Sequence, residues 1–262
     1  MSGTIEVQQQ TGVACVTLRH PGKLNAMSRA MWRELRSVFE NIQQSSDVRC
    51  VLVRGEGGDF CAGGDIAEYP AFRFDEASLR EFHENDVWGG LQAMLDCDLP
   101  IVAQIEGNCM GAGVEIACCC DIRIAATSAR FGAPIARLGF PMAPREAALA
   151  LREVGALTAR EMLLQAAVLG AAEMKTRGFL NQVVGDGAAA EAALATARQV
   201  AALAPYAARL NKRTIRALNQ VPALWDKQYE AIDSIVNAYR YADSAEHREG
   251  IGAFMQKRKP VF

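Results

Sequence analysis

The sequence has no apolar run that approaches the roughly 20 residues of a membrane-spanning helix. Its first residues, 1–7, also lack the basic start and apolar stretch of a signal peptide. Positive and negative charges nearly cancel, because 28 Lys and Arg stand against 30 Asp and Glu, for a net charge of -2. A general affinity for nucleic acid or for an anionic membrane is therefore not expected. We expect a cytoplasmic protein that binds any anionic ligand at a local site.

The spacings typical of metal sites are also missing. The three histidines, His20, His83 and His247, lie far apart in the sequence, and the eight cysteines show no paired ligand spacing. The consecutive cysteines at 118–120 cannot all point to one site from a helix, so we expect them to be small buried hydrophobic residues. No metal site is expected.

Hydrophobic residues make up 50% of the chain, which is enough for a sizeable core in one large domain or two small ones. Alternating apolar residues on both sides of Thr11 and Gly12 predict a hairpin. Ser28 can cap a helix, because apolar residues recur at helical spacing from Met31 to Ile42. The chain therefore opens with a hairpin followed by an amphipathic helix.

Short apolar runs at 50–53, 101–105 and 122–125 predict buried strands, and helices are expected at 76–95 and from Ala112. Strands that alternate with helices favour right-handed βαβ units and a largely parallel sheet. The sequence thus predicts an α/β core.

The pattern becomes mostly helical from about residue 145, with residues 181–184 as the only expected later strand and a helix after Ala188. We expect a core at 1–200 and a helical oligomerisation region at 201–262. A monomer would have difficulty covering the apolar positions of that region. These positions include Ile232, Ile235, Val236 and Tyr239.

Two glycine-rich turns, at 59–66 and 106–115, each follow a predicted strand and precede a helical segment. Ligands bind at the carboxyl ends of parallel strands, where glycine permits close backbone approach and helix-start amides carry partial positive charge. Neither turn fits the dinucleotide fingerprint or the phosphate-loop pattern. Together they could direct two N–H groups to one oxygen.

The combined pattern resembles the crotonase (enoyl-CoA hydratase/isomerase) superfamily. The matching motifs are Phe-Cys-Ala-Gly-Gly-Asp-Ile at 60–66, Gly-Ala-Gly-Val-Glu-Ile-Ala at 111–117, Cys-Asp-Ile-Arg-Ile-Ala at 120–125 and Ala-Arg-Phe-Gly at 129–132. The resemblance extends over nearly the whole chain, from 20–26 to 254–259. It implies an α/β fold built as a spiral of ββα units with a helical C-terminal subdomain, and a homotrimer or a homohexamer of two trimers.

The resemblance also implies an acyl-CoA thioester substrate whose carbonyl is polarised by the backbone amides of Gly64 and Ala112. Losing one such preorganised donor to an enolate-like oxygen costs on the order of 3 kcal/mol. CoA belongs to the substrate, so no cofactor is expected. The main chain at Ala62 resembles the segment that holds adenine, and Phe254 and Lys257 resemble residues that contact CoA, often from a neighbouring subunit. The remaining binding candidates are Lys23, Ala26, Gly63, Asp65, Ile66, Gly111 and Ile135.

Glu115 matches one of the two catalytic glutamates of the hydratases, and the position of the second holds Ile135. Hydration needs a base for water and an acid for the α-carbon, so one carboxylate must do both or another group must help. Three residues could give that help: His83, Arg145 and Glu146. A surface or helix-start position is nevertheless expected for each of the three.

Three functions therefore stay open. The first is an enoyl-CoA hydratase with Glu115 as principal acid/base, and the second is a double-bond isomerase in which Glu115 moves a proton along the acyl chain. The third is a catalytically weak acyl-CoA-binding protein. Acyl length and branching depend on the stretch 68–80 and the wall at 140–142, where the sequence has no clear pattern.

Overall fold

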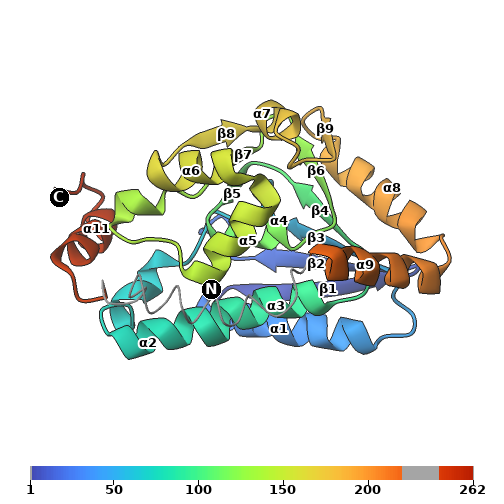
Figure 1. Ribbon diagram of the computed structural model, residues 1–262, viewed down its shortest axis with the longest axis horizontal. Coiled ribbons are helices and arrows are strands. Elements are labelled where there is room, and N and C mark those ends of the chain that lie inside the picture. The colour runs from blue at the N-terminus through green and yellow to red at the C-terminus, as the bar shows by residue number, and fades with distance from the viewer. Residues whose placement is uncertain (1, 220–241, 262) are drawn as a thin grey trace.

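The computed structural model describes residues 2–219 and 242–261, and its centre is a six-stranded sheet (Figure 1). The strand order is β1-β2-β3-β4-β6-β9. β1 (Thr4–Gln10) and β2 (Val13–Arg19) form the predicted antiparallel hairpin, and every other pair of neighbours is parallel. The other strands are β3 (Cys50–Gly55), β4 (Ile101–Ile105), β6 (Ile122–Ala126) and β9 (Gln182–Val184).

A second sheet of three short strands has the order β5-β7-β8. It consists of β5 (Asn108–Met110), β7 (Arg130–Gly132) and β8 (Val168–Gly170). The chain passes from the main sheet to this small sheet and then to a helix, as in β4, β5 and α4 (Ala112–Cys118), which confirms the spiral of ββα units. The expectation of a single later strand at 181–184 was wrong, because β8 precedes it. Such short strands show too few residues for an alternating pattern.

The helices follow the sequence pattern with one interruption. α1 (Arg29–Gln44) begins after Ser28, whose hydroxyl accepts from the Met31 N–H at 3.2 Å. The helix expected at 76–95 consists of α2 (Glu76–Glu81) and α3 (Trp88–Asp96) joined by a π-helical turn, Phe82–Val87. Such turns are rare and frequently occur at functional sites.

The remaining helices are mostly in the second half of the chain, as predicted. Two short 3₁₀ helices and six α-helices are described, and their bounds are η1 (Ile66–Ala71), η3 (Pro134–Leu138), α5 (Pro144–Val154), α6 (Ala156–Leu164), α7 (Ala171–Thr176), α8 (Ala189–Ala201), α9 (Pro205–Asn219) and α11 (Ala245–Met255). Among the residues described, no helix is long and apolar enough to cross a membrane.

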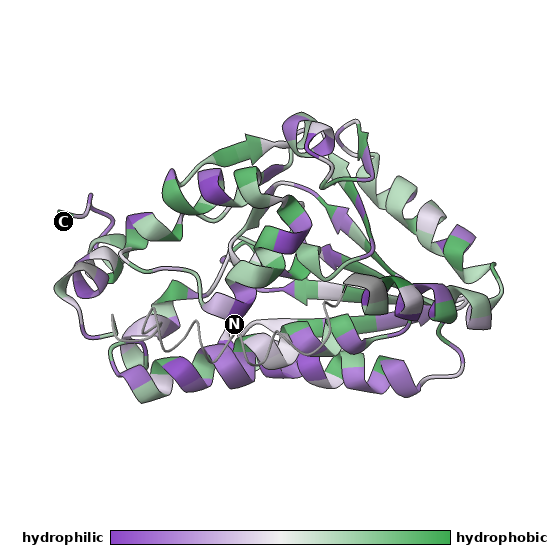
Figure 2. Cartoon of the chain, in the orientation of Figure 1, coloured by the Kyte–Doolittle hydropathy of each residue, from purple (hydrophilic) through white to green (hydrophobic). Residues whose placement is uncertain are grey.

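Hydrophobic residues cover both faces of the main sheet (Figure 2). In β3, Val51 and Val53 belong to the large core beneath α1 and α3, whereas Cys50 and Leu52 pack on the other face with α8. Strands of a parallel sheet are continuously apolar for this reason. The cysteines at 118–120 are buried in the large core, as predicted.

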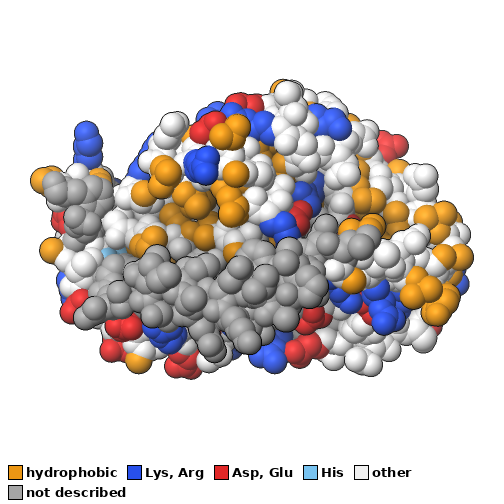
Figure 3. Space-filling model, viewed as in Figure 1, with side chains coloured by type: hydrophobic (Ala, Val, Ile, Leu, Met, Phe, Trp, Pro, Cys, Tyr) orange, Lys and Arg blue, Asp and Glu red, His pale blue; other side chains and the backbone are white. Residues whose placement is uncertain are grey.

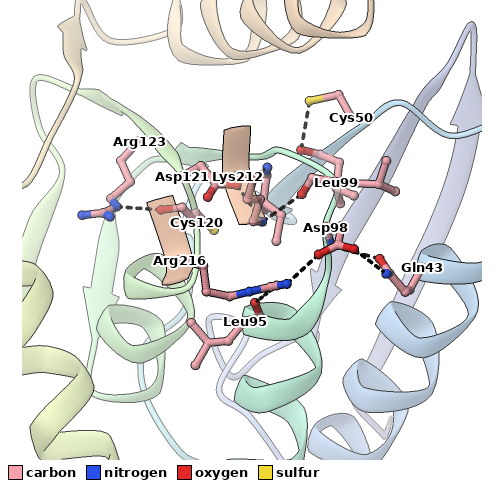
Figure 4. A network of polar contacts seen from close by, with 12 residues as sticks. Gln43, Cys50, Leu95, Asp98, Leu99, Cys120, Asp121, Arg123, Lys212 and Arg216 are labelled. Atoms are coloured by element: carbon pink, nitrogen blue, oxygen red, sulfur yellow. Dashed lines mark hydrogen bonds and ion pairs between the residues drawn. The ribbon is translucent and has the colours of Figure 1, made fainter. Parts of the chain in front are cut away.

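The basic residues of α9 attach it to the core (Figure 4). Lys212 donates to the Leu99 carbonyl oxygen at 2.8 Å, and its Nζ lies 2.8 Å from Oδ2 of Asp121. Arg216 donates to Oδ1 of Asp98 at 2.6 Å. The start of the C-terminal region is therefore bound to the segments that lead into β4 and β6.

The division into residues 1–200 and 201–262 stays a prediction. The apolar positions on which the predicted oligomer rests lie outside the described residues. They are Ile232, Ile235, Val236 and Tyr239.

Candidate active site

A cavity of about 540 Å³ lies between the two glycine turns, the π-helical turn and α11. Of the thirteen binding and catalytic residues expected from the sequence, all except Lys257 line it within the described part of the chain. They are Lys23, Ala26, Ala62, Gly63, Gly64, Asp65, Ile66, Gly111, Ala112, Glu115, Ile135 and Phe254. Lys257 is exposed just beyond α11. The structure therefore gathers in one place residues that lie up to about 230 positions apart in the sequence.

Hydrogen bonds join the two glycine turns side by side. The Cys61 N–H donates to the Asn108 carbonyl oxygen at 2.8 Å, and the Met110 N–H donates to the Cys61 carbonyl oxygen at 2.9 Å. Oδ1 of Asp59 accepts from both the backbone and the side chain of Asn108, at 2.8 and 2.7 Å. The two turns thus hold a fixed position relative to each other.

Within the described residues, neither the Gly64 N–H nor the Ala112 N–H donates to a backbone carbonyl oxygen. In the bridge between Gly64 and Met27, the N–H groups of Met27 and Asp65 form the bonds, so the Gly64 N–H is directed away from that bridge. Ala112 is the first residue of α4, and the first amides of a helix have no intrahelical acceptor. Both residues line the cavity.

Close packing explains the glycines of these turns. A Cβ atom on Gly64 would collide with the Tyr69 hydroxyl group. Gly111 has φ of +47°, and a Cβ there would lie 3.7 Å from Cα of Gly63. The positive φ favours glycine at position 111, whereas a Cβ 3.7 Å from Gly63 would make only an ordinary contact.

Glu115 lies on α4 with 9% of its surface exposed and lines the cavity. Burial raises the pKa of its carboxyl well above the ordinary value, and the charge of Glu146 raises this pKa further. A carboxyl group in such surroundings can hold a proton at neutral pH and donate it.

His83 and Glu146 do not lie at the surface, so that expectation was wrong, whereas the helix-start alternative was right for Glu146, which lies in the first turn of α5. Nδ1 of His83 lies 3.0 Å from Oε1 of Glu146, and the side chains are only 12% and 2% exposed. Burial raises the pKa of Glu146 to about 8, whereas burial followed by the charge of Arg73 holds the pKa of His83 well below 6.5. The π-helical turn and the first turn of α5 bring the two residues together.

Arg145 lies at the start of a helix, as the sequence predicts. It lies in the first turn of α5, and its Nε atom is 3.2 Å from Oε2 of Glu84. Its side chain is one-third exposed (33%) and does not line the cavity in the described part of the chain.

Arg73 is a cavity residue that the sequence pattern does not reveal. It is 1% exposed, and its guanidinium group lies over the rings of Tyr69 and Phe140, 4.5 and 4.1 Å from the centroids. The stretch 68–80 has no periodicity that would indicate a buried cation. A buried arginine is unusual because charged side chains are rarely fully buried.

Arg73 also brings together two histidines that are far apart in sequence. Its Nε donates to Nε2 of His247 at 3.4 Å, and its Nη1 lies 3.2 Å from Nε2 of His83. A guanidinium group can only donate, so both Nε2 atoms accept and both rings are neutral, with the proton on Nδ1. The His83 proton then faces Glu146, and the His247 proton faces the Ala242 carbonyl oxygen at 2.9 Å. In the described residues no group of three or more metal-binding side chains could hold a metal ion.

Comparisons with known proteins agree with this fold. A model of the enoyl-CoA hydratase/isomerase family matches residues 8–262. The enoyl-CoA hydratase EchA19 of Mycobacterium tuberculosis is 29% identical over 260 residues, 98% of this chain and 95% of that protein.

Solved structures are similar over the full length. An enoyl-CoA hydratase/carnithine racemase from Magnetospirillum magneticum has a TM-score of 0.81 and 34% identity, covering 100% of this chain and 96% of that one. A methylmalonyl-CoA decarboxylase in complex with 2-nitronate-propionyl-CoA has a TM-score of 0.86 and 25% identity, covering 99% and 98%. The fold is that of the crotonase superfamily. The chain belongs to the enoyl-CoA hydratase/isomerase family and is an enzyme of that family.

Proposed function

We propose that this protein is an enoyl-CoA hydratase-like enzyme that acts on an acyl-CoA thioester. The amides of Gly64 and Ala112 bind the thioester oxygen, and Glu115 is the principal acid/base. The observation that supports this most is that both amides and a buried carboxyl line the same cavity. Two preorganised donors stabilise the enolate oxygen as it forms, and the adjacent carboxyl transfers protons at the reacting carbons.

The CoA part of the substrate would lie along the first turn and the rim of the cavity. The main chain at Ala62 is proposed to hold adenine, with Phe254 and Lys257 contacting CoA. Phe254 is half exposed at the cavity, which leaves its ring free to contact a ligand. Lys23 lines the cavity and donates to Oδ2 of Asp65 at 2.5 Å. This hydrogen bond holds its ammonium group at the rim, where it would contact CoA. No cofactor beyond the substrate is proposed.

We also propose a homotrimer or a homohexamer. Figure 3 shows hydrophobic side chains over α6 and at the α8–α9 end of the molecule. Leu157 and Leu164 on α6 are 71% and 79% exposed, and Tyr206 on α9 is 75% exposed. Groups of exposed apolar side chains of this kind are candidate association sites. The cytoplasmic location expected from the sequence stays a prediction.

A double-bond isomerase is the second candidate. The reason is that the apolar Ile135 lines the cavity at the position where the hydratases have their second catalytic glutamate. The test is turnover of a panel of enoyl-CoA thioesters in ¹⁸O-labelled water, analysed by mass spectrometry. A hydratase incorporates the label into the product, and an isomerase does not. Tight thioester binding without turnover would instead indicate a catalytically weak acyl-CoA-binding protein.

A further inference from the structure

The cavity contains a buried cation, Arg73. Its side chain lines the cavity and is 1% exposed. The other two Lys or Arg side chains that line the cavity in the described part of the chain, Lys23 and Arg137, are exposed. Ligand cavities are mostly apolar, and a few polar or charged groups in them select and orient the ligand. Arg73 is therefore a candidate for such a group in the inner part of the cavity.

Two aromatic rings and two histidines hold the guanidinium group of Arg73 in place. It lies 4.5 Å from the ring centroid of Tyr69 and 4.1 Å from that of Phe140, and both rings line the cavity. Its Nε donates to Nε2 of His247, and its Nη1 lies 3.2 Å from Nε2 of His83. A guanidinium group that is already fixed loses little freedom on binding, and its planar fork of donors matches a carboxylate.

Tyr69 places this cation near the amide of Gly64. A Cβ atom on Gly64 would collide with the Tyr69 hydroxyl, so this hydroxyl lies against the backbone of Gly64. The ring of the same tyrosine contacts the guanidinium group of Arg73. A single tyrosine side chain thus separates the cation from the amide that we propose for the thioester oxygen. A few carbon atoms of an acyl chain can cover this span.

The acidic side chains near Arg73 do not compete with a ligand carboxylate at neutral pH. Burial raises the pKa of Glu115 well above its ordinary value and that of Glu146 to about 8, so both carboxyls can hold a proton at pH 7. Asp65, at the rim, forms an ion pair with Lys23. The two histidines are neutral, because they accept hydrogen bonds from Arg73. Among these side chains, an anionic group deep in the cavity meets the positive charge of Arg73.

We propose that the acyl group of the substrate carries a carboxylate a few carbons from the thioester, and that Arg73 binds this carboxylate. Arg73 is then a specificity-determining residue. An uncharged acyl chain would place apolar atoms against the guanidinium group, and such contact with a charged donor costs binding free energy. The inference rests on the proposed function, because the carboxylate reaches Arg73 when the thioester oxygen lies at Gly64 and Ala112.

Isothermal titration calorimetry with saturated thioesters tests the inference without turnover, because these thioesters have no double bond to hydrate or shift. Glutaryl-CoA is compared with its terminal amide, which has the same shape without the charge, and with valeryl-CoA. We expect the wild type to bind glutaryl-CoA about 10- to 100-fold more tightly than either uncharged thioester, the effect of a charged hydrogen-bonded pair. Equal affinities, or weaker binding of glutaryl-CoA, would overturn the inference.

Variants at position 73 assign the preference to one side chain. Arg73→Gln should abolish the preference for glutaryl-CoA while the affinity for valeryl-CoA changes little. The matched control is Arg145→Gln, which removes an equal charge outside the cavity and should keep the preference. If Arg73→Gln does not fold, Arg73→Lys keeps the charge without the planar fork and should reduce the preference. A full preference in a folded Arg73 variant would refute the role of Arg73.

The binding data and the turnover data fail separately. Turnover of uncharged enoyl-CoA thioesters by an enzyme with no preference for glutaryl-CoA would refute this inference and leave the proposed function intact. A clear preference for glutaryl-CoA that Arg73→Gln abolishes would support the inference even if no enoyl-CoA thioester is turned over, in which case the proposed function fails.

Discussion

Nδ1 of His83 lies 3.0 Å from Oε1 of Glu146, although 63 positions separate the two residues in the sequence. This contact joins the π-helical turn to the start of α5 directly behind the cavity. It places a second buried carboxyl behind the cavity wall, although Ile135 occupies the second glutamate position of the hydratases.

Gly64→Ala should disturb the oxyanion hole, because its Cβ would collide with the Tyr69 hydroxyl and displace the amide. We expect kcat to fall by about 10²-fold, the effect of losing one such donor. Steady-state kinetics on the preferred thioester measures this. The double variant Gly64→Ala with Tyr69→Phe removes the shortest contact and leaves the ring carbon Cζ 3.0 Å from the Cβ, so it should recover part of the loss.

Ala112→Gly is the matched control for the second turn. This change keeps the backbone N–H of residue 112, so kcat should stay within about 3-fold of the wild type. Full activity of Gly64→Ala, or a large loss in Ala112→Gly, would argue against the two amides as the oxyanion donors.

Ile135→Glu should raise hydratase activity if the wild type is a poor hydratase, because it adds a carboxyl to the cavity wall. The new carboxyl would be half-buried, so its pKa should be raised and the variant should be less stable. Initial rates of hydration measure the gain. Ile135→Gln, of the same size but without a titrating group, should show no gain, and equal rates for the two variants would count against a carboxyl effect.

Acid should destabilise the protein in part through His247. Burial lowers its pKa from 6.5 to about 4, so the unfolded chain binds more protons there. Its contribution to stability is complete above pH 6.5 and is lost as the pH falls toward 4. Melting temperatures from pH 7 to 4 should therefore fall less steeply for His247→Gln than for the wild type. An identical slope would exclude this histidine as a source of acid sensitivity.

The oligomer can be tested by light scattering at micromolar concentrations. We expect the mass of three or six chains of 28.3 kDa. Leu164→Lys places a charge on the exposed apolar surface of α6 and should weaken association if that surface is an interface. A monomer in the wild type would contradict both the oligomer and CoA contacts by a neighbouring Phe254 or Lys257.

The sequence predicts most of the fold because the main strands and helices have clear apolar periods. α1 is an example, with a capping Ser28 and a buried stripe from Met31 to Ile42. The strands β5, β7 and β8 are too short to show a period, and hydrogen bonds between distant segments form them.

In the candidate site, too, the sequence predicts the features that local patterns encode and misses those that depend on distant contacts. Glycine turns such as 59–66 are local signals, so the sequence reveals them. The burial of Arg73, His83 and Glu146 depends on contacts between distant segments. A helix-start glutamate such as Glu146 resembles many exposed ones, and only the packing of α5 against α4 distinguishes it.

The most direct test of the account is Glu115→Gln, which keeps the size and hydrogen-bonding reach of the side chain but cannot exchange a proton. Single-turnover rates and thioester affinity are measured together, so that chemistry and binding are separated. We expect the rate to fall by about 10² to 10⁴ while affinity changes little, as for removal of a general acid/base. A variant that retains the wild-type rate would show that Glu115 is not the catalyst.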